Sequence, residues 1–208
     1  MHKLTSRPRL FRGAMLVSAA GVLAIAGASS AAASSAAKVT VKYTVTGSTT
    51  IKSVNSTASL GPGQLKATVN LSTGKLSAAL TLPPASASFK ELGIIPVTAT
   101  TNFIQDGATT GTVNLKTGVT KTQSNITLQL TALNVAGVSL PVPSNCESAS
   151  PAQVDLTSQK GFNPLKGGNM SGTYTIPPFA HCGVLTLLLN ATIPGPGNTI
   201  TLKLAQAK

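Results

Sequence analysis

The sequence has few of the side chains that hold metals or cofactors. Charged residues make up 10% and aromatic residues 3% of its 208 positions, and tryptophan is absent. A zinc site takes three or four closely spaced histidine, cysteine or carboxylate ligands, and a calcium loop takes clustered acids. The chain has two histidines and two cysteines, and its four acids lie at least eight residues apart: Glu91, Asp106, Glu147 and Asp155. We therefore expect no metal site and no cofactor.

The same shortage argues against an enzyme. A Ser-His-Asp triad would need His181, Asp155 and one of many serines, but the sequence has no G-x-S-x-G nucleophile turn. His181 precedes Cys182, and neighbouring residues of a strand point to opposite faces, so they are badly placed as base and nucleophile. Paired-carboxylate hydrolysis needs two acids across a cleft, whereas Asp106 and Glu147 are expected in a turn and a loop. The chain is predicted to be non-enzymatic, with no catalytic residue.

The positive charge of the chain does not indicate nucleic-acid binding. The formal net charge is +12, but all arginines lie in the first 12 residues and the later lysines occur singly between Lys38 and Lys208. Nucleic-acid binders cluster their cations, use arginine forks and stack bases on aromatic rings. Scattered lysines instead protect strand edges and keep a β protein soluble. They are also compatible with weak attraction to an anionic wall polymer or a membrane surface.

Residues 1–33 are predicted to be a cleaved export signal. A basic segment at 1–12 precedes an apolar run at 14–26 and then a stretch of small residues, with Ala33 as the favoured cleavage position. An uncleaved anchor is the alternative, but this run of 13 residues is shorter than the roughly 20 of a spanning helix. No later apolar run is long enough to span a membrane. We expect a secreted protein, free or associated with the cell wall.

The two cysteines agree with export. Cys146 and Cys182 are 36 residues apart, and an even number of cysteines in an oxidising compartment predicts a disulfide. Closing a loop of this length stabilises the fold by roughly 3–4 kcal/mol in the chain-entropy view. Residues 141–151, which include Cys146, are expected to form a long surface loop held by this bridge.

Alternation of apolar and polar residues with a period of two runs through the rest of the chain. It predicts strands at 39–45, 63–71, 74–82, 94–105, 108–116, 120–131, 152–158, 169–176, 184–192 and 197–204. Turn signals separate them at 46–47, 61–63, 73–74, 106–107, 117–118, 167–168 and 195–197. Many short strands with regular turns indicate one all-β domain over residues 34–208, an antiparallel β-sandwich or a barrel-like sandwich.

A short repeat occurs within this domain. Residues 68–74 read TVNLSTG and residues 112–118 read TVNLKTG. Similar hairpins need similar turn chemistry, which is one explanation. An internal duplication that gave two related half-sheets is the other, and the sequence leaves both open.

Five stretches carry a resemblance to a group of proteins. They read TGKLSAALTLPP (73–84), ELGIIPVTATTNF (91–103), GFNPLKGG (161–168), MSGTYTIPPFAHCG (170–183) and IPGPGNTITL (193–202). Together with the alanine-rich start and an arginine-free body, they resemble uncharacterised exported β-rich proteins of actinobacteria. The resemblance implies export, a β-sandwich-like fold and one cysteine pair, and it implies no catalytic or binding residue.

Two functions fit these observations. The first is a structural or adhesive module of the cell envelope or extracellular space, with a cell-wall polymer as partner. The second is a carrier of an apolar ligand such as a lipid, with segments 91–97 and 184–189 lining the cavity. An enclosed apolar cavity above about 300 Å³ would favour the carrier, and a solid core would favour the envelope module. The oligomeric state does not follow from the sequence.

Overall fold

The computed structural model describes residues 37–91 and 93–207, so the predicted export signal lies outside the described residues. The described chain is almost entirely β, in an antiparallel arrangement. The longer strands are β1 (Lys38–Ile51), β2 (Ser56–Asn70), β3 (Lys75–Thr81), β4 (Ala85–Glu91), β5 (Ile95–Gln105), β6 (Thr109–Val113), β7 (Thr120–Val135), β10 (Ala152–Ser158), β11 (Gly167–Ile176) and β13 (Gly195–Gln206). The short elements are β8 (Val138–Leu140), β9 (Glu147–Ser148), β12 (Phe179–Ala180) and helix α1 (Leu185–Thr192).

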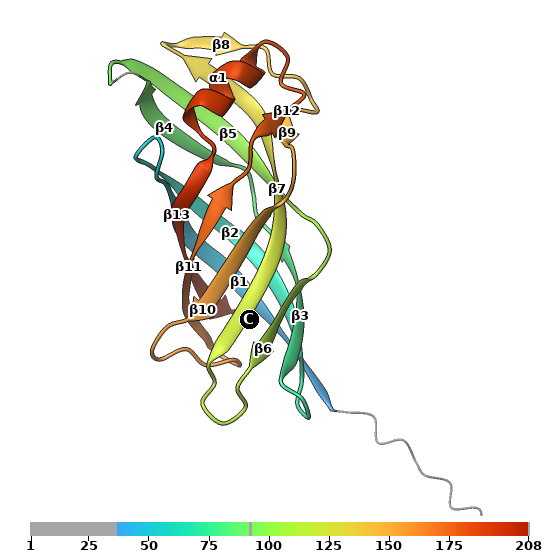
Figure 1. Cartoon of the computed structure of the whole chain (residues 1–208). Helices are drawn as coiled ribbons and strands as arrows, with labels where there is room; N and C mark the ends of the chain where they lie inside the picture. The colour runs from blue at the N-terminus through green and yellow to red at the C-terminus, as the bar shows by residue number, and fades with distance from the viewer. Residues whose placement is uncertain (1–36, 92, 208) are drawn as a thin grey trace, which may run out of the picture. The chain divides into compact units, whose positions relative to one another are not determined.

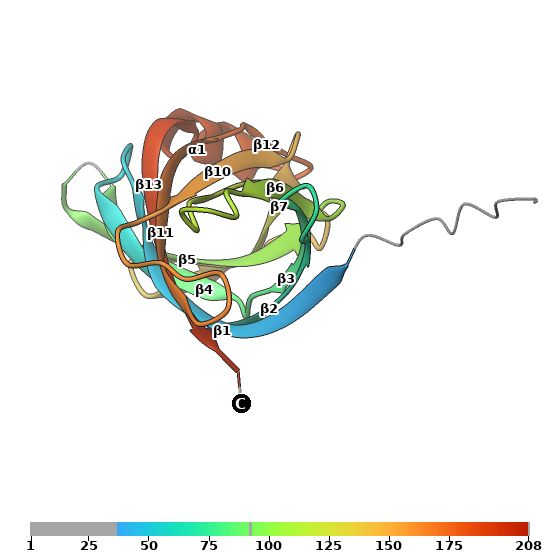
Figure 2. The ribbon, with the colours of Figure 1, turned by 90° about the horizontal axis from the view of Figure 1, so that it is seen from below.

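Eight of the strands close into a barrel (Figures 1 and 2). The order around the barrel is β10, β11, β13, β1, β2, β3, β6 and β7, and the pairing of β7 with β10 closes the ring. Closure pairs each of the eight strands with two neighbours, except that residues 56–63 of β2 pair with β1 alone. The expected all-β antiparallel class is therefore confirmed, in its barrel-like form.

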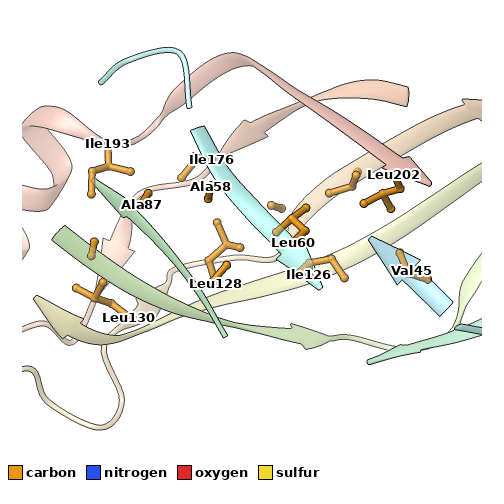
Figure 3. Packing of buried hydrophobic residues seen from close by; sticks show 14 of the residues in the cluster. Val45, Ala58, Leu60, Ala87, Ile126, Leu128, Leu130, Ile176, Ile193 and Leu202 are labelled. Carbon is orange, nitrogen blue, oxygen red and sulfur yellow. The ribbon is translucent and has the colours of Figure 1, made fainter. Parts of the chain in front are cut away.

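The period-two pattern of the sequence becomes an inside and an outside of this wall. On β1, Val41, Tyr43 and Val45 are buried, and the residues between them are exposed. Figure 3 shows Val45 and Leu202, together with residues of β2 and β7, among the side chains that meet in the interior. Burying each of these side chains stabilises the fold by about 1.5–3 kcal/mol. The burial directed by the alternation is therefore the main contribution that selects this fold.

The wall bends at glycines that the sequence led us to expect in turns. Strand β2 runs without a break through Gly61, Pro62 and Gly63. On the neighbouring strand β1, the register of the pairing with β2 shifts between Val45 and Gly47. A Cβ on Gly63 would lie 2.5 Å from the carbonyl oxygen of Thr81, so the strands approach too closely for a side chain. The predicted turns at 46–47 and 61–63 are wrong, because these residues form a bulge that curves the barrel wall.

The two ends of the barrel differ. One end, here called the mouth, carries the turns β2–β3, β6–β7 and β10–β11, together with the start of β1 and the end of β13 (Figure 1, bottom). The other end is covered by β8, β9, β12 and α1, here called the cap (Figure 1, top). Near the cap, β7 leaves β6 and pairs with β5, which in turn pairs with β4.

The cap is where the sequence reading failed most clearly. Residues 184–192 were expected to form a strand, but 185–192 form helix α1, with Leu185 and Leu189 buried one turn apart. The disulfide between Cys146 and Cys182 lies just before the helix, with both cysteines buried and their Cα atoms 4.3 Å apart. The predicted disulfide is confirmed. Among the described residues, no helix is long and apolar enough to cross a membrane.

Candidate functional site: the barrel interior and its mouth

The barrel interior holds three small cavities. The proximal cavity, nearest the mouth, has a volume of about 70 Å³, and the central and distal cavities have about 60 Å³ each. The proximal and central cavities share Leu80, Ser124, Leu156 and Leu202 as lining residues. The central and distal cavities share Thr49, Phe103, Leu128 and Tyr174. The three therefore follow one another along the barrel, separated only by side chains.

Small side chains create this space. Ala78 lines the proximal cavity, Ala152 the central one, and Ala87 and Ala99 the distal one, and all four are buried. Close packing normally leaves few voids larger than a water molecule, and in this domain three apolar voids lie in one row. A barrel of eight strands is just wide enough to be filled by side chains or to hold one small ligand. Alanines on several strands favour the second of these arrangements, an interior with room for one small ligand.

The interior is apolar and electrically neutral. No charged residue lines any of the three cavities. Two pairs of inward hydroxyl groups bond to each other: Thr109 and Ser124 lie 2.7 Å apart (Oγ1 to Oγ), and Thr49 and Tyr174 lie 2.7 Å apart (Oγ1 to hydroxyl). No buried side-chain polar atom of the described residues lacks a partner. Because the fully buried polar groups are already paired and no charge is present, the cavities favour an apolar occupant.

Both tyrosines of the chain belong to this interior. Burial raises the pKa of the Tyr43 phenol above its ordinary value. Burial also raises the pKa of Tyr174, while the hydrogen bond with Thr49 opposes part of that rise. Both rings are therefore held as neutral phenols, in keeping with an uncharged cavity.

A shallow hollow on the outside meets the proximal cavity at the mouth. This mouth hollow has a volume of about 410 Å³ and shares Val69, Val113, Phe162 and Pro164 with the proximal cavity. Residues 159–166, the β10–β11 connection, form a plug loop that places Phe162 and Pro164 between the two spaces. The plug loop therefore separates the mouth hollow from the proximal cavity.

Two contacts hold the plug loop. The phenol of Tyr43 donates a hydrogen bond to the carbonyl oxygen of Pro164. Phe162 packs against the backbone of Gly168, where an added Cβ would lie 2.9 Å from the Phe162 Cα. The glycine therefore makes room for the aromatic ring that closes the mouth.

Three turns at the mouth share one construction. Each has an asparagine whose carbonyl oxygen accepts a hydrogen bond from the backbone N–H of a glycine four residues later, at 2.7–2.8 Å. The side-chain oxygen of each asparagine also accepts hydrogen bonds from the N–H groups two and three residues on. The turns are 70–74 (NLSTG), 114–118 (NLKTG) and 163–167 (NPLKG).

This construction accounts for the repeat seen in the sequence by turn chemistry. Each glycine has a positive φ, between 70° and 99°, which a side chain would strain. The third copy was missed because its proline and leucine change the letters, although the spacing from asparagine to glycine is the same. A search for that spacing alone would have found all three turns.

The residues singled out from the sequence lie away from this site. His181 is exposed in the cap with a φ of 59°, and Asp155 lies on the outer face of β10. The Asp155 carboxylate accepts hydrogen bonds from Gln123 and Gln153, and no hydrogen bond in the described part of the chain joins it to His181. Segments 91–97 and 184–189 were expected to line a cavity, and this was wrong: neither lines one of the three interior cavities.

A larger hollow lies on the outer wall. It has a volume of about 680 Å³ and is bordered by residues of β10 and β11 and by prolines at the start of β13 and after β11. It is wide open and bordered by polar side chains and prolines, and Asp155 is its one charged residue. No group of three or more metal-ligating side chains occurs among residues 37–91 and 93–207.

Comparison of the chain with protein-family models, with curated proteins and with solved structures finds no match in any of the three.

Proposed function

We propose that the protein is a non-enzymatic carrier that takes one slender aliphatic chain, such as the acyl chain of a lipid, into the barrel. The observation that carries this proposal is the row of three neutral apolar cavities leading inward from the mouth hollow. The disulfide fits action outside the cytosol.

The size of the cavities sets the shape of the ligand. Each is far below the roughly 300 Å³ that we expected of a carrier cavity, so that expectation was wrong and no compact small molecule fits in any one of them. Together they offer more space than the ~150 Å³ of an apolar cavity that takes up benzene. Since they lie in a row, small rotations of Leu80, Phe103 and Leu128 join them into a narrow channel. A ligand only one methylene wide fits such a channel, and a sterol or a folded peptide does not.

The mouth fits the other end of such a ligand. Lys116 borders the mouth hollow, whereas no charged side chain lines the interior. A carboxylate or phosphate head group would therefore remain at the mouth beside Lys116 while the chain extends inward. Each methylene that leaves water contributes about 0.8 kcal/mol, so affinity should rise with chain length until the distal cavity is full.

Palmitate binding to the delipidated protein, followed by isothermal titration calorimetry, tests the proposal. The informative variant is Ala78→Leu, which fills the proximal cavity from β3. The matched control is Ala79→Leu, the next residue, which faces outward and is exposed. We expect palmitate binding by the natural chain and by Ala79→Leu, and at least tenfold weaker binding by Ala78→Leu at unchanged or higher melting temperature.

Two results would overturn the carrier. One is the absence of palmitate binding together with a clean mass, free of lipid, for the protein isolated from its own culture medium. The other is equal binding by both alanine variants, which would place the ligand outside the barrel. Either result would leave the structural or adhesive envelope module as the remaining proposal, with binding to isolated cell wall as its assay.

A further inference from the structure

Exposed leucines surround the mouth hollow. Leu71, Leu115 and Leu165 all line it, and they are 44%, 49% and 56% exposed. Single exposed leucines are ordinary on a protein surface, but here three of them border one hollow. We call these three residues the leucine rim.

The leucine rim is built by the three related turns. Leu71 and Leu115 hold the second position of their five-residue turns, and Leu165 holds the third position of its turn, after Pro164. The turn geometry needs only the asparagine and the glycine, so the middle positions are free to be polar. That all three carry leucine next to the channel opening indicates a use for apolar side chains there.

Lysines gather at the same end. They are far apart in the sequence, but hairpins return the chain to the mouth again and again. The mouth lysines, all exposed, are Lys38 at the start of β1, Lys75 at the start of β3, Lys116 in the β6–β7 turn, Lys121 at the start of β7, and Lys160 and Lys166 in the plug loop.

No acid balances these lysines at the mouth. Glu91 ends β4, Asp106 follows β5, Glu147 lies in the cap, and Asp155 is inside β10, so none of the four acids of the chain is in a mouth turn. Higher on the same half of the barrel, Lys42 faces Lys66 directly across β1 and β2. Like charges placed opposite each other cost stability. A positive field maintained at such a cost favours a negatively charged partner.

We propose that the mouth docks on the surface of a bilayer that contains anionic phospholipid. The leucine rim would insert between head groups while the mouth lysines contact phosphates, as amphipathic surfaces do at membranes. This inference rests on the proposed function, because docking would bring the channel opening to the source of its ligand. An anionic polymer would use the lysines alone, so the leucine rim favours the bilayer.

The cap provides an internal comparison. It exposes Val184 and Leu187 at 95% and 84%, more than any residue of the rim. Lys52 in the β1–β2 turn and Lys90 in β4 lie toward that end of the barrel together with Glu91 and Glu147, so that end has no excess of one sign. Exposed apolar area without a positive field should not select anionic membranes.

Co-sedimentation with vesicles tests the docking. The probes are vesicles of phosphatidylcholine with phosphatidylglycerol, and vesicles of phosphatidylcholine alone. We expect binding to the anionic vesicles only, weakened by salt and reduced about fivefold for each mouth lysine changed to glutamine at Lys75, Lys116 and Lys166. The variant Leu71→Ser/Leu115→Ser/Leu165→Ser should bind at least tenfold more weakly. The matched controls Val184→Ser/Leu187→Ser and Lys52→Gln/Lys90→Gln should bind as the natural chain does.

Three outcomes would overturn the docking. They are no binding to either vesicle, equal loss in the cap controls, and full binding by the leucine variant, which would indicate a polyanion site instead. Thermal unfolding of each variant separates lost binding from lost folding. The carrier is tested separately: Ala78→Leu should bind vesicles normally, so a failure of docking leaves palmitate binding intact and a failure of the carrier leaves docking intact.

Discussion

The hydroxyl of Tyr43, on the inner face of β1, donates a hydrogen bond to the carbonyl oxygen of Pro164 in the plug loop. The bond joins residues 121 positions apart and ties the loop that closes the mouth to the barrel wall. It is the contact most directly placed to regulate access to the interior.

Removal of this bond should loosen the plug loop. We expect Tyr43→Phe to lower the free energy of unfolding by about 1 kcal/mol and to speed hydrogen exchange in residues 159–166. Palmitate should associate faster in stopped-flow mixing. Tyr174→Phe is the control, since its hydroxyl bonds to Thr49 deep in the barrel. Equal acceleration in both variants would show that the Tyr43 bond has no special role at the mouth.

The distal cavity should set the longest chain that the barrel accepts. Ala87→Leu fills that cavity from β4 and leaves the proximal one unchanged. Palmitate affinity should fall at least tenfold while octanoate affinity stays the same, because each methylene that no longer fits forfeits about 0.8 kcal/mol. Calorimetric titration with both acids measures the difference. If the two acids weaken equally, the chain does not reach the distal cavity.

The disulfide should stabilise the cap without shaping the barrel. Cys146→Ala/Cys182→Ala opens a loop of 36 residues and should lower the free energy of unfolding by roughly 3–4 kcal/mol. The strand content measured by circular dichroism should remain, because neither cysteine lies in a strand of the closed barrel. Urea unfolding of the variant, with the reduced natural chain for comparison, measures the loss. An unchanged midpoint would contradict the assigned role.

The phenol groups of the two tyrosines should lose their protons only at unusually high pH. Burial raises the pKa of both phenols above the ordinary value of about 10, so the folded state retains its protons where the unfolded state loses them. The resulting stability is fully present below about pH 10 and is lost as the pH rises through the raised values. Phenolate absorbance is a clean probe, since the chain has two tyrosines and no tryptophan. Normal titration in the folded protein would contradict their burial.

Local signals in the sequence were sufficient for most of the barrel wall. Strand β10 was predicted with its observed bounds, because Pro151 precedes it and strict alternation runs to its end. The bulge at 61–63 was misread as a turn, since Gly-Pro-Gly serves either role and the facing strand decides between them. Helix α1 was misread for a related reason: a segment of eight residues rich in leucine and threonine fits the period of a strand as well as that of a helix. Its anchors, Cys182 and the contact of the Asn190 side chain with Phe179, are tertiary.

The candidate site was harder to predict from the sequence than the fold. A cavity depends on which alanines face each other across the closed barrel. Period-two alternation shows which face of its strand a residue lies on, but not which residue lies opposite it in the interior. The mouth lysines were read as scattered because they are scattered along the chain. Only the return of each hairpin to the same end brings Lys75, Lys116 and Lys166 together.

The cap and the plug loop have a kinetic consequence. In the proposed carrier, the mouth serves for both entry and release because the cap covers the other end, so a guest leaves by the path on which it arrived. Loading and unloading then compete for the same opening and cannot occur together. Exchange between two guests would proceed through an empty barrel, with a rate set by how often Phe162 moves aside and independent of the concentration of the newcomer.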